Sequence, residues 1–192
     1  MNFTEVRRVA QHAWEHRHML YSYALMRLAM ISPFTAANAF LHKLRGVKVG
    51  KEVRIAHDVL IDPMEPKSVT LEDHVTISPR VTIYAHTNPT MPLYEYMGPR
   101  TVDPVIVGEG SWIGTGAIIL PGAIIGKYCV IGAGSVVTTN IPHHTLAAGV
   151  PARLVRTLKK IHDIPKDATR SRVLVLHDKH GENIRTQSAP SS

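Results

Sequence analysis

An aliphatic residue recurs at every sixth position along the middle of this chain. Between residues 105 and 137 the repeating positions are Val107, Ile113, Ile119, Ile125, Ile131 and Val137. A small residue stands two places before five of them, at Ser111, Ala117, Ala123, Cys129 and Ser135. An α-helix has no period of six, whereas a coil of short strands has one flat face for each hexad. The repeat therefore predicts a mainly β fold, a β-helix whose aliphatic side chains point inward.

The same phase continues towards the N-terminus, with two interruptions. The first run upstream consists of Leu71, Ile77 and Ile83. Because the step from Ile83 to Val107 equals four hexads, loop 84–104 is an insertion into the repeat. An earlier run consists of Val49, Ile55 and Ile61, and the segment Pro63-Met64-Glu65-Pro66 shifts its phase. Twelve hexads in all predict about four coils of three faces each.

The segment before the repeat predicts a cover for one end of the column. Residues 1–46 carry apolar residues at helical spacing until Pro33 breaks the pattern, which indicates an N-terminal helical segment. Its apolar stretch 19–26, flanked by Arg17 and Arg27, fits contact with the column, with a neighbouring subunit or with a membrane surface. Packing on the column or on a neighbouring subunit is the favoured interpretation, and peripheral membrane contact is the alternative.

The remaining segments complete the predicted domain organisation. Residues 47–151 form the β-helix with its loop 84–104, and residues 152–192 form a short basic helix followed by a polar tail. Near the N-terminus, His12 and His16 stand one helical turn apart, but the residues between them do not make the zinc-protease signature. No metal is therefore expected there.

The composition agrees with one packed domain in a reducing compartment. With 192 residues, 44% of them hydrophobic, the chain can bury a core without disulfides, and its single cysteine cannot form one internally. Cys129 occupies a small inward position of its hexad, so we expect it to pack rather than react. The N-terminal residues MNFTEVRR lack the apolar core of a signal peptide, which predicts a cytoplasmic protein.

The charge of the chain favours anionic partners without indicating nucleic acid. The formal net charge is +7 and the pI is about 9.7. The basic residues do not form a patch interleaved with aromatic residues, which is the pattern of a nucleic-acid-binding surface. A phosphate-bearing small molecule accounts for part of the charge, and a non-catalytic binding scaffold remains an alternative.

Two stretches of the chain are similar to a known group of enzymes. They read VIVGEGSWIGTGAIILPGAIIGKYCVIGAGSVVTTNIP and AAGVPARLVR. On these motifs the chain resembles the hexapeptide-repeat acyltransferases over roughly residues 47–158. Within that group it is similar to the maltose/galactoside and xenobiotic acetyltransferases and to the O-acetyltransferases of surface polysaccharides. The resemblance implies a left-handed parallel β-helix and acetyl-CoA as co-substrate, whereas general packing rules would predict right-handed crossovers.

The inserted loop opens with a candidate general base, His86. Transfer of an acetyl group from a thioester to a hydroxyl needs a base for the hydroxyl proton, and neutral imidazole suits that task near pH 7. The resemblance implies this role for His86, although Thr87 and Asn88 separate it from Pro89 where the family often has His-Pro. A histidine that only hydrogen-bonds locally is the alternative. Since no Ser-His-Asp or Cys-His pattern competes, direct transfer without a covalent enzyme intermediate is expected.

The resemblance also implies a set of residues that bind the donor. The matching positions are Trp112, Thr115, Ala133, Thr138, Thr139, Arg153 and Arg156. Trp112 would wall the reaction site, and Thr115 and Ala133 would line the pantetheine groove. Thr138, Arg153 and Arg156 would surround the nucleotide end of coenzyme A. Guanidinium groups suit phosphates because they donate bidentate, charge-assisted hydrogen bonds. The family commonly has lysine where this chain has Thr139, and solvated surface charges are the alternative for the two arginines.

The candidate acceptor residues lie in the stretch AHDVLIDPMEP. They are His57, Asp58 and Asp62, two carboxylates and an imidazole that favour a sugar over an apolar drug-like acceptor. An aspartate before a proline also shapes turns, which is the alternative for Asp62.

These observations together predict an acetyl-CoA-dependent O-acetyltransferase for a sugar or surface-polysaccharide precursor, either free in the cytoplasm or at the inner face of the membrane. A xenobiotic O-acetyltransferase is the alternative. A γ-class carbonic anhydrase has the same coil but binds zinc through three histidines, and His86 has no histidine close by in the sequence. Since a long loop leaves a prism with three flat faces, we expect a homotrimer with active sites between subunits.

Overall fold

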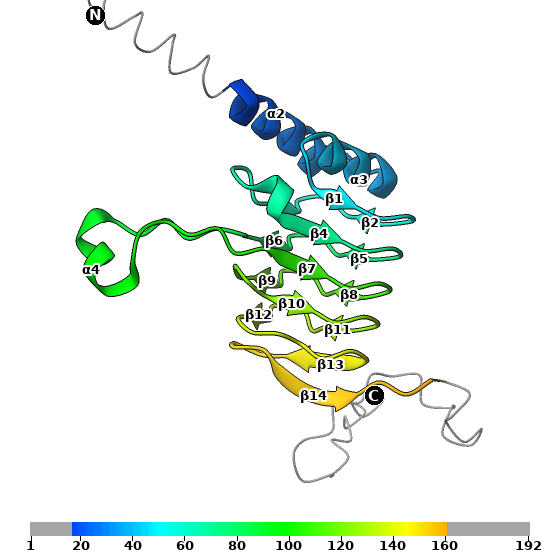
Figure 1. Ribbon diagram of the computed structural model, residues 1–192. Coiled ribbons are helices and arrows are strands. Elements are labelled where there is room, and N and C mark those ends of the chain that lie inside the picture. Colours follow the sequence, from blue (N-terminus) through cyan, green and yellow to red (C-terminus); the bar gives the residue numbers. More distant parts are fainter. Residues whose placement is uncertain (1–16, 161–192) are drawn as a thin grey trace, which may run out of the picture. The chain divides into compact units, whose positions relative to one another are not determined.

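The computed structural model describes residues 17–160, and its centre is a column of short strands stacked coil upon coil (Figure 1). The first coil contains β1 (Lys48–Val49), β2 (Arg54–Ile55) and β3 (Leu60–Ile61), and the second contains β4 (Val69–Leu71), β5 (Thr76–Ile77) and β6 (Thr82–Ile83). The third contains β7 (Val105–Val107), β8 (Trp112–Ile113) and β9 (Ile118–Ile119), and the fourth contains β10 (Ile124–Ile125), β11 (Val130–Ile131) and β12 (Val136–Val137).

Equivalent strands of successive coils pair in parallel and build three sheets. Sheet A has the order β1-β4-β7-β10, and sheet C has the order β12-β9-β6-β3. Sheet B contains β2, β5, β8 and β11 and continues through β13 (Thr145–Ala148) and β14 (Arg153–Thr157). Three parallel sheets around one axis are typical of a left-handed parallel β-helix, so the predicted mainly β fold of four coils is confirmed.

The inward aliphatic residue of each hexad builds the core. Eleven of these side chains are at most 1% exposed, and they are Ile55, Ile61, Leu71, Ile77, Ile83, Val107, Ile113, Ile119, Ile125, Ile131 and Val137. Burying each one contributes roughly 1.5–3 kcal/mol, which makes the column the main source of stability. The small residues two places earlier are buried as well, and Cys129 is among them. Burial raises the pKa of the Cys129 thiol, as expected for a packing role.

Glycine after the aliphatic residue serves close approach between coils. A Cβ on Gly108 or Gly114 would lie 2.6 Å from the backbone of the next coil. The glycines that adopt positive φ are those in the following turns, for example Gly116 and Gly134. The six-residue period thus favours glycine for two different physical reasons, although Glu52, His74 and Tyr128 also adopt positive φ in equivalent turns.

Two helices cover the first coil and partly confirm the predicted N-terminal helical segment. They are α2 (Arg17–Ile31) and α3 (Thr35–Leu44), and Pro33 lies between them. Met26, Ala29 and Ala39 are their buried apolar residues. Residues 1–16, with His12 and His16, lie outside the described residues.

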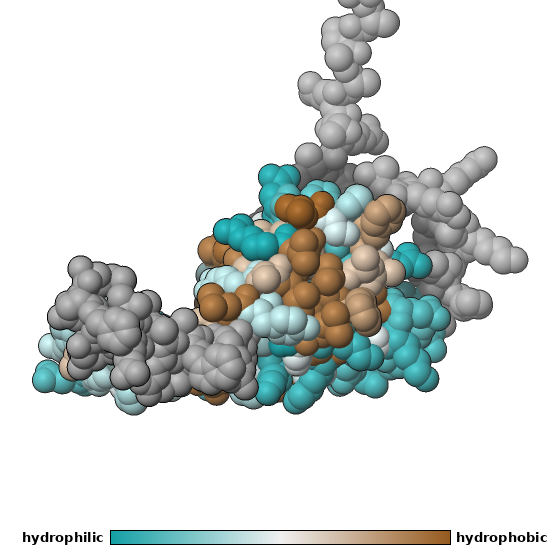
Figure 2. Space-filling view, turned by 90° about the horizontal axis from the view of Figure 1, so that it is seen from above, coloured by the Kyte–Doolittle hydropathy of each residue, from teal (hydrophilic) through white to brown (hydrophobic). Residues whose placement is uncertain are grey.

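The outer side of this cap is apolar. Figure 2, which looks onto the capped end, shows hydrophobic residues gathered over it. The large exposed apolar side chains of α2 and α3 are Leu20, Tyr21, Tyr23, Leu28, Ile31, Phe40 and Leu44. Within residues 17–160 none of the helices has the length and apolar character that crossing a bilayer requires. Peripheral membrane contact through this face stays a prediction.

The chain after the fourth coil is a strand, and the predicted C-terminal helix is wrong at this point. Gly149, Val150 and Pro151 lie in a turn, after which β14 runs back antiparallel to β13, with Arg156 opposite Leu146. The open edge of β13 outweighs the helical pattern of this segment. Pairing with β14 satisfies backbone groups of β13 that would otherwise have no hydrogen-bond partner. The tail after residue 160 lies outside the described residues.

Both predicted interruptions of the repeat appear as insertions at the same edge of the column. Residues 62–68 link β3 to β4 and include the short helix η1 (Pro66–Ser68). Residues 84–104 link β6 to β7 and project from the column as an arm that carries η2 (Met91–Leu93) and α4 (Tyr94–Met97) (Figure 1). Both insertions follow a strand of sheet C, so they bring irregular chain to the edge between sheets C and A.

Candidate active site

His86 lies where the projecting arm leaves the column. It follows β6 and pairs with Val102 in an isolated antiparallel bridge, so the two chains of the arm are joined at its base. The Thr87 amide donates to the Thr101 carbonyl at 3.0 Å, and the Asp103 amide donates to the Ala85 carbonyl at 2.8 Å. The backbone of His86 is therefore held on both sides, and its side chain is 7% exposed.

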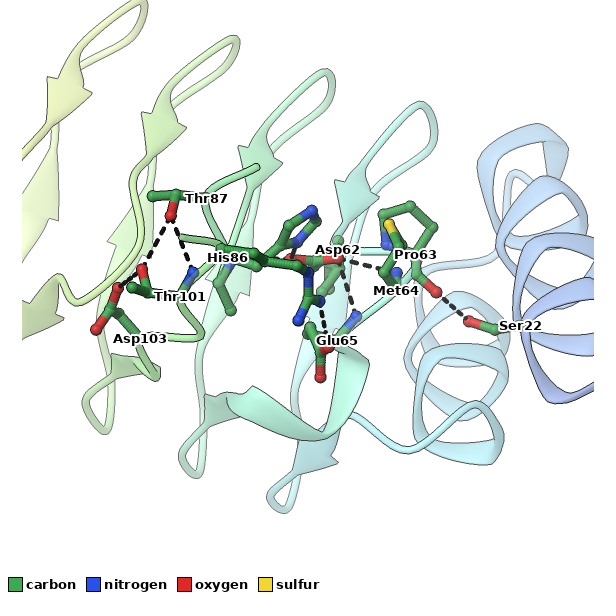
Figure 3. A network of polar contacts seen from close by, with 12 residues as sticks. Ser22, Asp62, Pro63, Met64, Glu65, His86, Thr87, Thr101 and Asp103 are labelled. Carbon is green, nitrogen blue, oxygen red and sulfur yellow. Dashed lines mark hydrogen bonds and ion pairs between the residues drawn. The ribbon is translucent and has the colours of Figure 1, made fainter. Parts of the chain in front are cut away.

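The imidazole of His86 meets a buried carboxylate from the coil before it. His86 Nδ1 and Asp62 Oδ2 are 2.5 Å apart (Figure 3). The Asp62 side chain is fully buried, and Tyr84 packs edge-on against the His86 ring with centroids 5.7 Å apart. The two residues meet because Ile61 and Ile83 are paired in sheet C, which places the residues after them side by side.

Asp62 accepts hydrogen bonds from four donors. Oδ1 accepts from the amides of Met64 at 2.9 Å and Glu65 at 3.0 Å, and Oδ2 accepts from the Ala85 amide at 2.9 Å and from His86 Nδ1. Burial alone would raise the pKa of Asp62, but these four hydrogen bonds outweigh burial and hold the pKa below its ordinary value. Asp62 is therefore a carboxylate at neutral pH.

This geometry assigns the tautomer of His86. An ionised carboxylate is acceptor-only, so Nδ1 of the imidazole carries the proton and Nε2 carries the lone pair. A histidine held in this way can take a proton at Nε2, and the adjacent carboxylate stabilises the positive charge that results. This is the arrangement that a general base needs.

The position of Asp62 corrects its predicted role. We expected the Asp62 carboxylate to hold an acceptor hydroxyl, but it is inaccessible and its oxygens are already occupied. The alternative interpretation, that Asp62 shapes the turn before Pro63, is part of what the structure shows, since Oδ1 accepts from two amides of that turn. The repeat could have indicated the contact between Asp62 and His86. Its phase aligns Asp62 with residue 84, two positions before His86.

The turn after Asp62 is also tied to the projecting arm. Arg100, near the end of the arm, forms an ion pair with Glu65 in the 62–68 insertion. Thr101 Oγ1 donates to Asp103 Oδ2 at 2.8 Å and lies 2.9 Å from Thr87 Oγ1, which links the two chains at the base of the arm (Figure 3). The two insertions of the repeat thus form one connected structure around the Asp62–His86 pair.

The predicted donor residues are all exposed, and five of the seven lie on sheet B or in the turns between sheets B and C. Trp112 stands on β8 with 46% of its surface exposed, and its Nε1 donates to Ser78 Oγ at 2.8 Å. Thr115 and Ala133 occupy equivalent turns between sheets B and C, and both are exposed. Ser78, the partner that orients the indole, was not among the predicted residues.

The two arginines and the two threonines lie on different parts of the column. Arg153 and Arg156 are exposed on β14, the last strand of sheet B. Thr138 and Thr139 follow β12 in sheet C, two strands along the sheet from β6 and thus about 10 Å along the column from the coil of His86. Within one chain, the edge that holds His86 carries these threonines but none of the other predicted donor residues.

The predicted acceptor residues His57 and Asp58 lie in the turn between β2 and β3. Both are more than half exposed, and His57 Nε2 lies 4.0 Å from Asp58 Oδ2. The Asp58 amide donates to the Met30 carbonyl of α2 at 2.9 Å. This turn lies at the edge between sheets B and C, in register with the turns of Thr115 and Ala133. Within one chain, the turn with His57 and Asp58 therefore does not lie beside His86.

Metal ligands do not gather anywhere in the part of the chain that the structure describes. Among residues 17–160 no three side chains of histidine, cysteine, aspartate or glutamate come together as a possible metal site. The chemistry that this site offers from its own residues is proton transfer at His86.

Known proteins that resemble this chain are transferases built on the same repeat. The profile of the family "Bacterial transferase hexapeptide (six repeats)" matches residues 104–139. The galactoside O-acetyltransferase of Escherichia coli (strain K12) is 41% identical over 91 residues, which are 47% of this chain and 45% of that protein. The galactoside O-acetyltransferase of Lactococcus lactis subsp. lactis (strain IL1403) is 39% identical over 100 residues, 52% of this chain and 47% of that protein.

Solved structures extend the similarity over most of the fold. A maltose O-acetyltransferase from Clostridium difficile 630 has a TM-score of 0.60 and 27% identity, covering 75% of this chain and 88% of that one. A galactoside acetyltransferase in complex with coenzyme A has a TM-score of 0.60 and 28% identity, covering 74% of this chain and 82% of that one. The chain is therefore similar to the hexapeptide-repeat acetyltransferases in both sequence and fold.

These similarities confirm the resemblance inferred from the motifs. The chain spans about half the length of the curated relatives it matches. The matched profile covers β7 to β12, whereas Asp62 and His86 lie before it. The function of this chain is therefore inferred from its own residues.

Proposed function

We propose that this protein is an acetyl-CoA-dependent O-acetyltransferase that acts on a sugar hydroxyl, with His86 as the general base. The observation that carries the proposal is the buried Asp62–His86 contact of 2.5 Å, which leaves Nε2 as a proton acceptor. Similarity to the hexapeptide-repeat acetyltransferases supports the acyl-transfer chemistry, and the names of the relatives, galactoside and maltose O-acetyltransferases, support a sugar as acceptor. A cytoplasmic location would suit the use of acetyl-CoA as co-substrate.

His86 would handle a single proton in both halves of the reaction. Nε2 takes the proton of the acceptor hydroxyl while that oxygen attacks the thioester carbonyl carbon of acetyl-CoA. When the tetrahedral intermediate collapses, the carbon–sulfur bond breaks and the imidazolium returns the proton to the leaving thiolate. The products are the acetyl ester and free coenzyme A. Asp62 keeps the proton on Nδ1 throughout and stabilises the imidazolium.

Acetyl-CoA would bind along sheet B and its edge with sheet C. Trp112 would wall the reacting end, and the backbones of Thr115 and Ala133 would line the pantetheine. Arg153 and Arg156 are exposed on the terminal strand of the same sheet, where their guanidinium groups would pair with phosphates. Thr138 and Thr139, at the edge with sheet A, would contact the nucleotide end from the other side.

The separation of these residues supports a site shared between subunits. His86 lies at the edge between sheets C and A, whereas Trp112 lies on sheet B, so one chain holds only part of the site. In a three-fold homotrimer, the edge of one subunit that carries His86 would face the edge between sheets B and C of the next subunit. That edge also carries His57 and Asp58, which are exposed and would contact the sugar from the neighbouring subunit.

A screen of acceptors with a base-deficient variant tests the activity. Release of coenzyme A is measured with simple glycosides, nucleotide-sugars and hydroxylated antibiotics, for the wild type and for His86→Ala. We expect turnover of a sugar and a decrease in kcat of about 10²- to 10⁴-fold for the variant, with unchanged acetyl-CoA binding. More than about a third of the activity remaining in His86→Ala would reject His86 as the base, and turnover of the antibiotics alone would reject the sugar.

Complementation tests the shared site. We expect the variants His86→Ala and Trp112→Ala each to have little activity alone. The two are unfolded and refolded together to form mixed trimers. If each site combines residues of two subunits, the mixture regains activity that neither variant has alone, because some sites are built from the two intact parts. A monodisperse, fully active monomer in light scattering would contradict the proposal.

A further inference from the structure

We infer that Arg45, and the N-terminal helical cap through it, positions the Asp62–His86 pair. This inference rests on the proposed function, since it assigns a role in placing the base. Arg45 immediately follows α3, and its side chain is only 5% exposed. It reaches from the cap to the segment that carries Asp62, the one residue that holds His86 Nδ1.

The Arg45 guanidinium donates hydrogen bonds in three directions. Nη2 donates to the backbone carbonyls of Ile61, at 2.8 Å, and Asp62. Nε donates to Ser22 Oγ of α2 at 3.1 Å, and Nη1 lies 3.0 Å from His42 Nδ1 of α3. The planar fork of arginine makes this possible, since an ammonium group cannot present donors with the same fixed spacing.

Ser22 closes the connection from the other helix. Its hydroxyl accepts from Arg45 Nε. It donates to the Pro63 carbonyl at 2.9 Å, a contact that Figure 3 shows. The carbonyls of three consecutive residues, 61 to 63, are therefore held by two side chains of the cap. Both of these side chains are buried.

The charges in this cluster suit a fixed arginine. Burial lowers the pKa of Arg45 to about 10, so the guanidinium stays charged at neutral pH. Burial and the nearby Arg45 charge lower the pKa of His42 to about 3, so His42 is neutral and its Nδ1 accepts from Arg45. Asp62 is the anion that faces the buried cation and raises its pKa against burial.

The contacts connect the cap to His86 in two steps. Arg45 and Ser22 fix the backbone on both sides of Asp62, and the carboxylate of Asp62 fixes the imidazole. A contact of 2.5 Å between two groups with little exposure leaves no room for the carboxylate to follow a shifted backbone and keep the same geometry. Loss of the Arg45 contacts should therefore change the orientation of the base as well as the stability of the cap.

Another cap residue supplies a matched control. Asn38 is fully buried on α3, and its Nδ2 donates to the Ile55 carbonyl and the Ser32 carbonyl, both at 3.1 Å. It joins the same helix to the same coil, but at β2 rather than at the strand that leads to Asp62. Asn38→Ala thus removes a comparable cap-to-column connection without touching the segment of Asp62.

The experiment measures catalysis, the histidine proton and stability in the same variants. The full-length variants are Arg45→Gln, Arg45→Lys, Ser22→Ala and Asn38→Ala. The assays are kcat and acetyl-CoA KM with methyl β-galactoside as acceptor, the Nδ1 proton resonance of His86 in protein labelled with ¹⁵N-histidine, and thermal unfolding. His86→Gln identifies the resonance.

We expect Arg45→Gln to lower kcat by about ten- to a hundredfold with little change in acetyl-CoA KM, as small misplacements of a catalytic group do. The Nδ1 proton resonance should shift or disappear, and Arg45→Lys should recover part of both losses. Ser22→Ala should lower kcat by roughly three- to tenfold in the same manner. Asn38→Ala should lower the unfolding temperature but keep the wild-type kcat and resonance.

The inference is overturned if Arg45→Gln and Ser22→Ala lose only stability and keep both the kcat and the histidine resonance of the wild type, as Asn38→Ala does. If Arg45→Gln does not fold, Ser22→Ala decides alone. Failure of the proposed function would look different, because either the wild type would not turn over the sugar or His86→Ala would stay active. The resonance would still report whether the cap holds the Asp62–His86 pair.

Discussion

Replacing Asp62 by asparagine should invert the protonation of His86. The carboxylate receives two hydrogen bonds at each oxygen, from Met64 and Glu65 at Oδ1 and from Ala85 and His86 at Oδ2. Asparagine keeps one oxygen and presents an NH₂ group in place of the other. If the oxygen stays with Met64 and Glu65, the NH₂ group faces His86 Nδ1, which must then become an acceptor.

The imidazole proton consequently moves to Nε2, where the base is needed. With the wrong tautomer in an otherwise intact site, kcat should fall by about 10³- to 10⁴-fold, as in other enzymes whose base is oriented by an aspartate. The reverse orientation of the introduced asparagine's side-chain amide would leave the backbone amides of Met64 and Glu65 without an acceptor. Two unsatisfied donors cost more free energy than one, so this orientation is disfavoured.

Stability should fall much less than activity. In the favoured orientation the Ala85 amide loses its acceptor, and a buried unsatisfied donor costs about 1–3 kcal/mol. The buried Arg45 also loses the anion that faces it. The assay compares coenzyme A release at saturating acetyl-CoA with acetyl-CoA binding by calorimetry and with denaturant unfolding. Binding should be unchanged, because Asp62 has no exposed surface.

Asp58→Asn is the control for this substitution. It makes the same chemical change in an exposed carboxylate that only approaches His57. Its kcat should stay within about threefold of the wild type, with any effect in the acceptor KM. If Asp62→Asn keeps more than about a third of the wild-type kcat, Asp62 does not set the tautomer of the base, and the argument from the 2.5 Å contact is wrong.

Three further outcomes follow from the same geometry. Arg153→Ala and Arg156→Ala should each raise the acetyl-CoA KM about tenfold with little change in the acceptor KM, and unchanged values in both would make them solvated surface charges. The pKa of His42 falls from 6.5 unfolded to about 3 folded, so the unfolded chain takes up the proton first and stability declines as pH falls from 6.5 to 3. His42→Gln should flatten that decline in unfolding measurements, and an unaltered profile would exclude His42. Because the pKa of Asp62 lies below 3.8, the stability advantage of the wild type over Asp62→Asn should persist at neutral pH and shrink as pH falls below about 3.8.

The phase of the hexads predicted the column because each residue's environment in a β-helix repeats with its sequence position. Ile83 and Ile119 fall in register in sheet C as their spacing of six hexads requires, and Ile61 joins them once the insertion after it is allowed for. The same phase located both insertions, and the position of His86 at the start of the longer one followed from counting. Local rules were sufficient here, since every coil has the same inward and outward positions.

At the C-terminal end of the column, the local sequence pattern predicted a helix where the structure has a strand. Residues 153–157 have no repeat neighbour beyond them, so their structure depended on the open edge of β13 rather than on their own helical spacing. Strand pairing won because it satisfies backbone groups that a helix would have left exposed at the sheet edge.

The role of Asp62 depended on contacts between segments that are far apart in the chain. From the residues alone it was a polar side chain beside a proline, suited to a turn or to a sugar. Its burial, its four donors and its link to Arg45 arise only when the cap, the first coil and the second coil pack together. The repeat determined where each coil lies because it is encoded every six residues, whereas the function of a buried charge follows from the groups that folding brings around it.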